Sequence, residues 1–228
     1  MKVYTERGTK RVFAGALDWP GWCRSGPNDA AALEALVAYG PRYAEVLTGT
    51  DLAFPVPTKS SSLTVAESLE GDATTDFGAP SIAPAADVRV VKPHELARLR
   101  TILEACWVAF DKVAQTAVGR ELSKGPRGGG RDLQVIIGHV VGAEASYLRR
   151  LAATPPPVND ADAAAAMMEV RETVLDALTR AVEEGLPAQG PRGGRIWSPR
   201  YFVRRTMWHV LDHAWEIEDR SAGSGGLT

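Results

Sequence analysis

The second half of the chain repeats its hydrophobic residues at the spacing of amphipathic helices. Four segments show this pattern, and short loops rich in glycine and proline separate them. They span residues 94–119, 131–152, 160–185 and 199–220. Each has about 20 residues or more, which corresponds to a helix close to 30 Å long. The pattern predicts an antiparallel four-helix bundle over residues 93–220.

The first part of the chain alternates short β-type runs with a helical run. The runs "KVYTER" and "RVFAGAL" are rich in β-branched and aromatic residues and predict a hairpin that turns at Gly8. The next segment, "DWPGWCRSGPND", is dense in turn formers and predicts a loop, after which Asn28 or Asp29 is expected to cap a helix over "AAALEALVAY". Further strands are predicted at "SSLTVAES" and "DVRVV", and residues 70–86 between them carry no prediction.

These elements place the chain in the α+β class. We expect a small mixed N-terminal domain over residues 1–92, the bundle over 93–220 and a flexible tail over 221–228, where "SAGSGGLT" has almost nothing to bury. The N-terminal order of strand, turn, strand, "PG" corner and Ala/Leu helix resembles the start of the HicB-type antitoxin fold over about the first 47 residues. Trp22 and Cys23 follow that corner, and no toxin-binding residue can be carried over from the family.

Composition is that of a soluble globular protein, with 45% hydrophobic and 24% charged residues. The net charge is -2, and the chain carries 9 basic against 11 acidic residues before Pro93 and 17 against 17 from it onward. Neither half is therefore a basic surface for nucleic acid or a membrane. No segment approaches the roughly 20 apolar residues of a membrane span, and the start has no signal peptide, so we expect a cytoplasmic protein.

The two cysteines are too few for a disulfide framework. Cys106 lies in the apolar run "TILEACWVAF" and is expected to be a buried, inert thiol. Cys23 is expected to be a loop thiol without a role.

Two of the four histidines lie four residues apart in the last predicted helix, within "RRTMWHVLDHAWEIEDR". Residues four apart differ by about 40° in direction, so His209 and His213 share one face with Asp212 and Glu216. The apolar residues form a stripe on the opposite side: Val203, Met207, Val210, Leu211, Ala214 and Ile217. The face with the histidines is therefore either a metal site or a solvated polar surface.

A third histidine favours the metal site. His139 projects from the second predicted helix beside Gly142 and other small residues, which leave space over it. If it faces the same cleft as His209 and His213, three neutral imidazoles form a site that keeps positions open for water or substrate. For zinc, this is the catalytic rather than the structural arrangement.

Four other residues are considered for a functional role: His94, Glu144, Arg127 and Arg192. His94 opens the first predicted helix and is expected at the surface. Glu144 falls within an apolar stripe, so it is either a buried carboxylate satisfied by an arginine or a tryptophan N–H, or a functional acid. Arg127 and Arg192, in the two "GPRGG" loops, either meet a substrate carboxylate or are solubilising loop charges.

The segments "GHVVGAEASYLRRL" and "RRTMWHVLDHAWE" resemble the DinB/YfiT-type four-helix bundle, in which one histidine comes from the second helix and an H-x-x-x-H pair from the fourth. The resemblance covers residues 93–220. It implies that His139, His209 and His213 bind one divalent metal, with zinc or nickel expected. It also implies metal-dependent transfer or isomerisation with a low-molecular-weight thiol such as mycothiol or bacillithiol.

Several functions stay open on this basis. The same metal could activate water instead of a thiol, which makes a metal-dependent hydrolase an alternative. Asp212 and Glu216 are candidates to hold imidazole N–H groups or to accept a proton. A non-enzymatic alternative is a protein-binding module, in which the HicB-like unit binds a protein partner and the histidines have no role. If the chain is an enzyme, we expect a small-molecule substrate. A homodimer is also compatible with the bundle.

Overall fold

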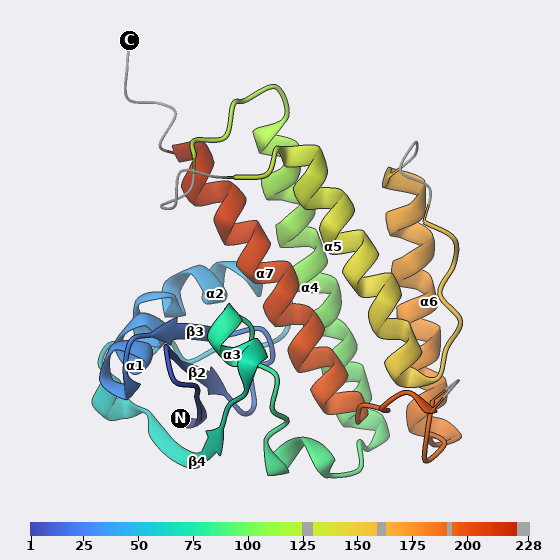
Figure 1. Cartoon of the computed structure of the whole chain (residues 1–228), viewed down its shortest axis with the longest axis horizontal. Helices are drawn as coiled ribbons and strands as arrows, with labels where there is room; N and C mark the ends of the chain where they lie inside the picture. The colour runs from blue at the N-terminus through green and yellow to red at the C-terminus, as the bar shows by residue number, and fades with distance from the viewer. Residues whose placement is uncertain (125–129, 159–162, 191–192, 223–228) are drawn as a thin grey trace.

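The computed structural model describes residues 1–124, 130–158, 163–190 and 193–222, and Figure 1 shows the whole chain. The fold is α+β, with a four-stranded mixed sheet and short helices first and four long helices after them. In Figure 1, the last helix lies between the N-terminal unit and the second long helix. The long helices are α4 (Pro93–Ala117), α5 (Leu133–Leu148), α6 (Ala163–Glu183) and α7 (Pro199–Ala222).

The sheet has the strand order β3-β2-β1-β4. Its strands are β1 (Lys2–Arg7), β2 (Val12–Ala16), β3 (Cys23–Gly26) and β4 (Thr64–Glu70). β1 and β2 form the predicted antiparallel hairpin, and the Gly8 N–H donates a hydrogen bond to the Arg11 carbonyl across the turn at 2.9 Å. β4, which includes most of the predicted strand "SSLTVAES", pairs in parallel with β1.

The segment "DWPGWCRSGPND" is predicted to be a loop, but it contains the strand β3. This strand pairs antiparallel with β2 at the edge of the sheet. Cys23 begins it, is 2% exposed, and has its pKa raised to about 12 by burial. The expected loop thiol is therefore a buried and unreactive core thiol.

The strand predicted at residues 87–91 is also wrong. The 3-10 turn η2 (Ala85–Val88) occupies its first residues instead. The physical reason lies at Asp87, which is 1% exposed and accepts hydrogen bonds from Arg204 of α7 at 2.6 and 2.7 Å. A carboxylate cannot be buried without such a partner, and the turn brings it there.

Three short helices accompany the sheet: α1 (Asp29–Ala38), α2 (Gly40–Val46) and α3 (Ala73–Phe77). Asn28 caps α1 as predicted, because its side chain accepts a hydrogen bond from the Ala31 N–H at 3.0 Å. α3 lies in the segment that carries no prediction. Asp72 caps it by accepting hydrogen bonds from two backbone N–H groups of its first turn.

All four predicted long helices are present, and Cys106 is buried in α4 as expected. A 3-10 turn, η3 (Arg149–Leu151), follows α5. α7 continues to Ala222, so it takes in the first two residues of the predicted tail. The rest of that tail and the first "GPRGG" loop lie outside the described residues. Within the ranges that the structure describes, no helix has the length and apolar character needed to cross a membrane.

One hydrophobic core runs through the N-terminal unit and the bundle. It includes Trp22 and Tyr43 from the first part together with Ile102 of α4 and Met207 of α7. Arg204 adds a polar connection, since it donates hydrogen bonds to two backbone carbonyls at the end of β2 at 2.5 and 2.8 Å. The division into domains at residue 92 stays a prediction. What the packing fixes is the position of α7, which carries two of the three candidate histidines.

Candidate metal centre

Three histidines that are far apart in the sequence come together on α5 and α7. His139 comes from α5, and His209 and His213 come from successive turns of α7. One ring nitrogen of each lies within 4.8 Å of the other two. Nε2 of His209 and Nε2 of His139 are 3.1 Å apart. The structure thus brings together all three predicted ligands.

The local sequence explains this arrangement. The predicted apolar stripe of α7 is buried in the core, which fixes the opposite face of the helix toward α5. On α5, a Cβ built on Gly138 or Gly142 would meet no other group within 4 Å. The space beside His139 is therefore open, as the small residues of this segment predict.

His139 and His209 are held in the neutral form, which is the form that binds a metal. His209 is 8% exposed, and burial, followed by the neighbouring His213, lowers its pKa to about 2. Burial and His213 also lower the pKa of His139. Nδ1 of His209 is buried without a hydrogen-bond partner. His209 is therefore not part of a solvated polar surface, which is the alternative to a metal site.

Glu216 holds the third histidine in place. Its Oε2 is 2.8 Å from Nδ1 of His213, and its Oε1 accepts a hydrogen bond from Arg220 at 2.8 Å. The hydrogen bond with His213 keeps the pKa of Glu216 below its ordinary value, so the carboxylate is charged. With Nδ1 engaged, Nε2 of His213 is left for a ligand role, and a carboxylate behind a ligating histidine is the usual support of a metal site.

The other predicted acid has a different contact. Asp212 accepts a hydrogen bond from Arg24 of β3 at 2.9 Å and so connects α7 to the sheet. The guanidinium of Arg24 is fixed there by the ring of Tyr39, 4.0 Å away. Of the two acids on this face, Glu216 contacts a histidine and Asp212 forms an ion pair.

This donor set fits a divalent cation. Imidazole nitrogen suits zinc, nickel and their neighbours, and three such donors leave coordination positions open. The three rings converge without a carboxylate between them, and His213 lowers the pKa of both His139 and His209. A metal ion would supply a positive charge that burial disfavours on His139 and His209 themselves.

Glu144 is the buried acid predicted on α5, and a tryptophan N–H satisfies it. Nε1 of Trp107 donates to its Oε1 at 2.6 Å, while Oε2 is buried without a hydrogen-bond partner. Burial raises the pKa of Glu144 to about 7, although the charge of Arg171 and the Trp107 hydrogen bond oppose this. The carboxyl is thus protonated in mildly acidic solution.

This pKa predicts how stability depends on pH. A carboxyl whose pKa is higher in the folded chain contributes stability that is complete below its ordinary value of 4.5 and is lost as pH rises to about 7. At 1.36 kcal/mol per pH unit over the interval from 4.5 to about 7, the loss is roughly 3 kcal/mol. Urea denaturation of the wild type and Glu144→Gln across this range should show it, since the variant lacks the titration. A constant difference between the two would contradict the assignment.

The remaining sequence candidates do not join the cluster. His94 is exposed in the first turn of α4, as predicted. Arg127 and Arg192 lie outside the described residues.

Sequence reasoning missed three residues beside the histidines: Tyr147, Arg205 and Trp208. The rings of Tyr147 and Trp208 each lie 6.1 Å from the ring of His209. Tyr147 lies eight residues after His139 and Arg205 four before His209, so continuing the helical spacing by one or two turns would have found both.

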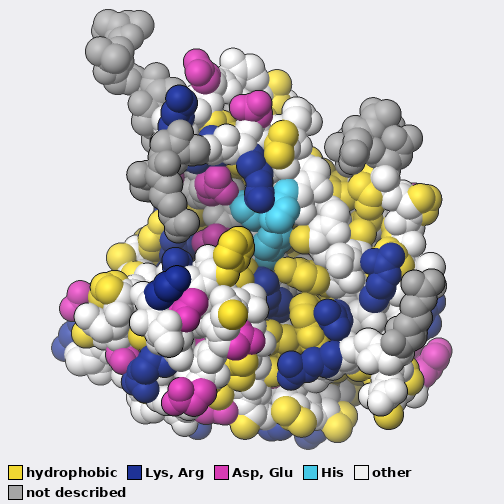
Figure 2. Space-filling view, in the orientation of Figure 1, with side chains coloured by type: hydrophobic (Ala, Val, Ile, Leu, Met, Phe, Trp, Pro, Cys, Tyr) yellow, Lys and Arg dark blue, Asp and Glu magenta, His cyan; other side chains and the backbone are white. Residues whose placement is uncertain are grey.

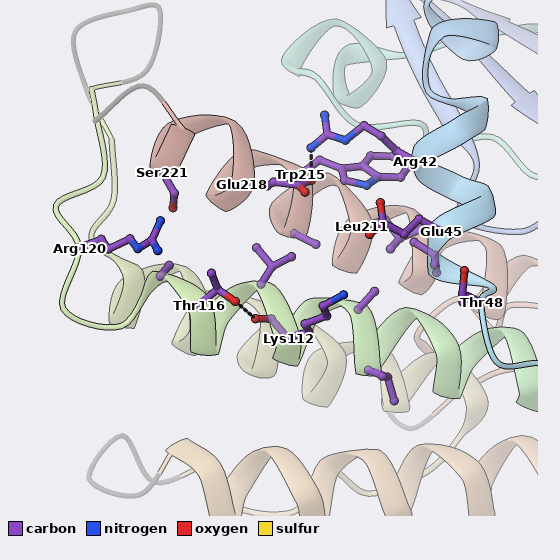
Figure 3. A pocket seen from close by; sticks show the side chains of 16 residues that line it. Arg42, Glu45, Thr48, Lys112, Thr116, Arg120, Leu211, Trp215, Glu218 and Ser221 are labelled. Atoms are coloured by element: carbon purple, nitrogen blue, oxygen red, sulfur yellow. Dashed lines mark hydrogen bonds and ion pairs between the residues drawn. The ribbon is translucent and has the colours of Figure 1, made fainter. Parts of the chain in front are cut away.

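The histidines reach the surface. Figure 2 shows them as a single patch with Lys and Arg side chains next to it and hydrophobic side chains nearby. A separate groove of about 580 Å³ lies between α2, α4 and α7. Figure 3 shows Arg42, Trp215 and Glu218 on one wall of this groove, with Lys112 and Arg120 on the other. None of the described residues that line the groove is a histidine or cysteine, so the candidate metal centre is elsewhere.

Comparison with known proteins gives one match. A family model described as the DinB superfamily matches residues 102–217, which is just over half of the chain. No curated protein and no solved structure matches. The matched region begins in α4 and includes all three histidines. None of the comparisons supports the HicB-type resemblance of the N-terminal part.

Proposed function

The chain belongs to the DinB superfamily, and we propose that it is a metal-dependent transferase or isomerase that uses a low-molecular-weight thiol. His139, His209 and His213 hold the ion, with zinc or nickel expected. The observation that carries the proposal is the convergence of one nitrogen from each ring within 4.8 Å at the surface of the molecule. Three nitrogen donors leave room for a substrate atom on the ion.

The bound ion would lower the pKa of a thiol and present it as a thiolate at neutral pH. The chain's own residues prepare the site for this. Burial keeps His209 unprotonated, and Glu216 fixes the ring of His213 through Nδ1. Tyr147 and Trp208 place aromatic rings beside the ring of His209.

One contact favours a thiol over the activation of water. In many metal-dependent hydrolases a carboxylate beside the ion also takes a proton from the attacking water. Both oxygens of Glu216 are engaged, one by His213 and the other by Arg220. A thiol needs no such base, because its ordinary pKa near 8.5 is already close to neutral pH. Mycothiol and bacillithiol are the candidate thiols.

The proposal is tested with untagged, zinc- or nickel-loaded protein, a cysteine-derived thiol and an activated aryl chloride. The thiolate sulfur forms a bond to carbon, chloride leaves with the bonding electrons, and the thiol proton goes to the buffer. We expect thioether formation above the uncatalysed rate, its loss in His213→Ala and its retention in His94→Ala. Equal rates in the wild type and His213→Ala with every thiol tried would count against the proposal. Hydrolysis of an ester without thiol would favour the hydrolase.

A further inference from the structure

Arg205 lies one helical turn before His209, on the same side of α7. Its guanidinium carbon is 4.5 Å from the ring centroid of Trp208 and 5.5 Å from that of Tyr147. These are the same two rings that lie 6.1 Å from the His209 ring. Two aromatic side chains therefore hold the guanidinium beside the histidine cluster.

This guanidinium lacks a compensating carboxylate. Its Nη1 is buried without a hydrogen-bond partner, and within the part of the chain that the structure describes no Asp or Glu forms an ion pair with it. Several partly or fully buried arginines do have such partners, among them Arg24, Arg171, Arg204 and Arg220. A buried donor without an acceptor costs stability, so a group outside the chain is the natural acceptor.

The charges around the cluster point to an anion. Arg205 and Arg131 both lower the pKa of His209 through their positive charge. The acid in contact with the cluster, Glu216, is balanced by Arg220. Figure 2 shows Lys and Arg side chains next to the histidine patch, with Asp and Glu side chains on another side of it. A ligand at the histidines thus approaches a mixed surface in which Arg205 has no ion-pair partner among the described residues.

We propose that Arg205 is an anion-binding subsite of the metal centre and that a substrate carries a carboxylate close to the group bound at the histidines. A guanidinium binds a carboxylate through parallel N–H donors, and the aromatic rings keep its plane fixed for this geometry. The inference rests on the proposed function, because it takes the histidine cluster as the place where the substrate reacts. The carboxylate belongs either to the thiol or to its electrophilic partner.

Binding measurements with small probes test this inference. Cobalt-loaded protein is titrated with 3-mercaptopropionate and with the neutral 3-mercaptopropionamide, and the absorption of the metal centre reports both. We expect the charged thiol to bind about tenfold or more tightly. Arg205→Met should remove this preference and Arg205→Lys should keep part of it, while the metal affinity stays the same. Arg150→Met is the matched control, because Arg150 also lies over a ring, that of Trp197, but donates to the Arg195 carbonyl.

Two further arms identify the source of the carboxylate and separate this inference from the metal hypothesis. Propionate that binds to protein saturated with the neutral thiol, and fails to bind to Arg205→Met, would place the carboxylate on the second substrate. In metal-free protein, propionate should still change the tryptophan fluorescence of the wild type and not that of Arg205→Met. The inference would be overturned if the charged and neutral thiols bind the wild type and Arg205→Met with equal affinity and propionate gives no signal in either measurement. This holds even if the protein binds metal.

Discussion

Saturating zinc is expected to raise the melting temperature of the wild-type chain, and His139→Ala, His209→Ala and His213→Ala are each expected to lose most of that increase. The three nitrogens converge only in the folded chain, so zinc binds that state and stabilises it. At 100 times the dissociation constant the linkage amounts to about 2.7 kcal/mol. For a chain of this size, that corresponds to about 5 to 10 °C. Calorimetry or circular dichroism with and without zinc measures it.

His94→Ala is the control for this prediction. His94 is exposed at the start of α4 and should leave the zinc-dependent increase intact. The prediction is wrong if zinc and nickel leave the wild-type melting temperature unchanged. It is equally wrong if the alanine variants of the cluster keep the whole increase.

Arg204→Met is expected to cost about 3 to 5 kcal/mol of folding stability, which is the usual effect of leaving one partner of a buried ion pair alone. Arg204 is 4% exposed and Asp87 is 1% exposed. Removing the guanidinium leaves the carboxylate uncompensated and also deprives the Ala16 and Leu17 carbonyls of their donor. Urea denaturation of metal-free protein at neutral pH gives the difference.

Two variants define what the Arg204 result means. Adding Asp87→Leu to Arg204→Met should restore part of the stability, because it removes the unpaired charge but not the unpaired carbonyls. Arg7→Met breaks the exposed pair with Asp29 and should barely move the denaturation midpoint. A loss in Arg204→Met no larger than in Arg7→Met would contradict the importance of the buried pair.

Elements with a regular pattern were predictable from the sequence. The four long helices and the β1–β2 hairpin follow from hydrophobic spacing and β-branched runs. β3 has four residues among turn formers, and its pairing with β2 is not visible in that composition. Residues 87–91 alternate like a strand, but the position of Asp87 depends on Arg204, 117 residues further along the chain.

The candidate site shows the same limit. Helical spacing together with the family resemblance predicted that His139, His209 and His213 come together. Spacing could not separate Asp212 from Glu216, because both share the histidine face. Asp212 instead pairs with Arg24, which lies 188 residues earlier in the sequence. Helical periodicity therefore predicts which residues share the histidine face of α7. Contacts with distant segments determine what each of these residues does.

The most direct test of the metal centre is a calorimetric titration of untagged, metal-free protein with zinc, together with the metal content after dialysis. We expect one ion per chain in the wild type and no tight binding in His209→Ala, whose ring is the most deeply buried of the three. No zinc uptake by the wild type, or the same uptake in His209→Ala, would contradict the three-histidine site. The protein-binding alternative would then be the better explanation of this chain.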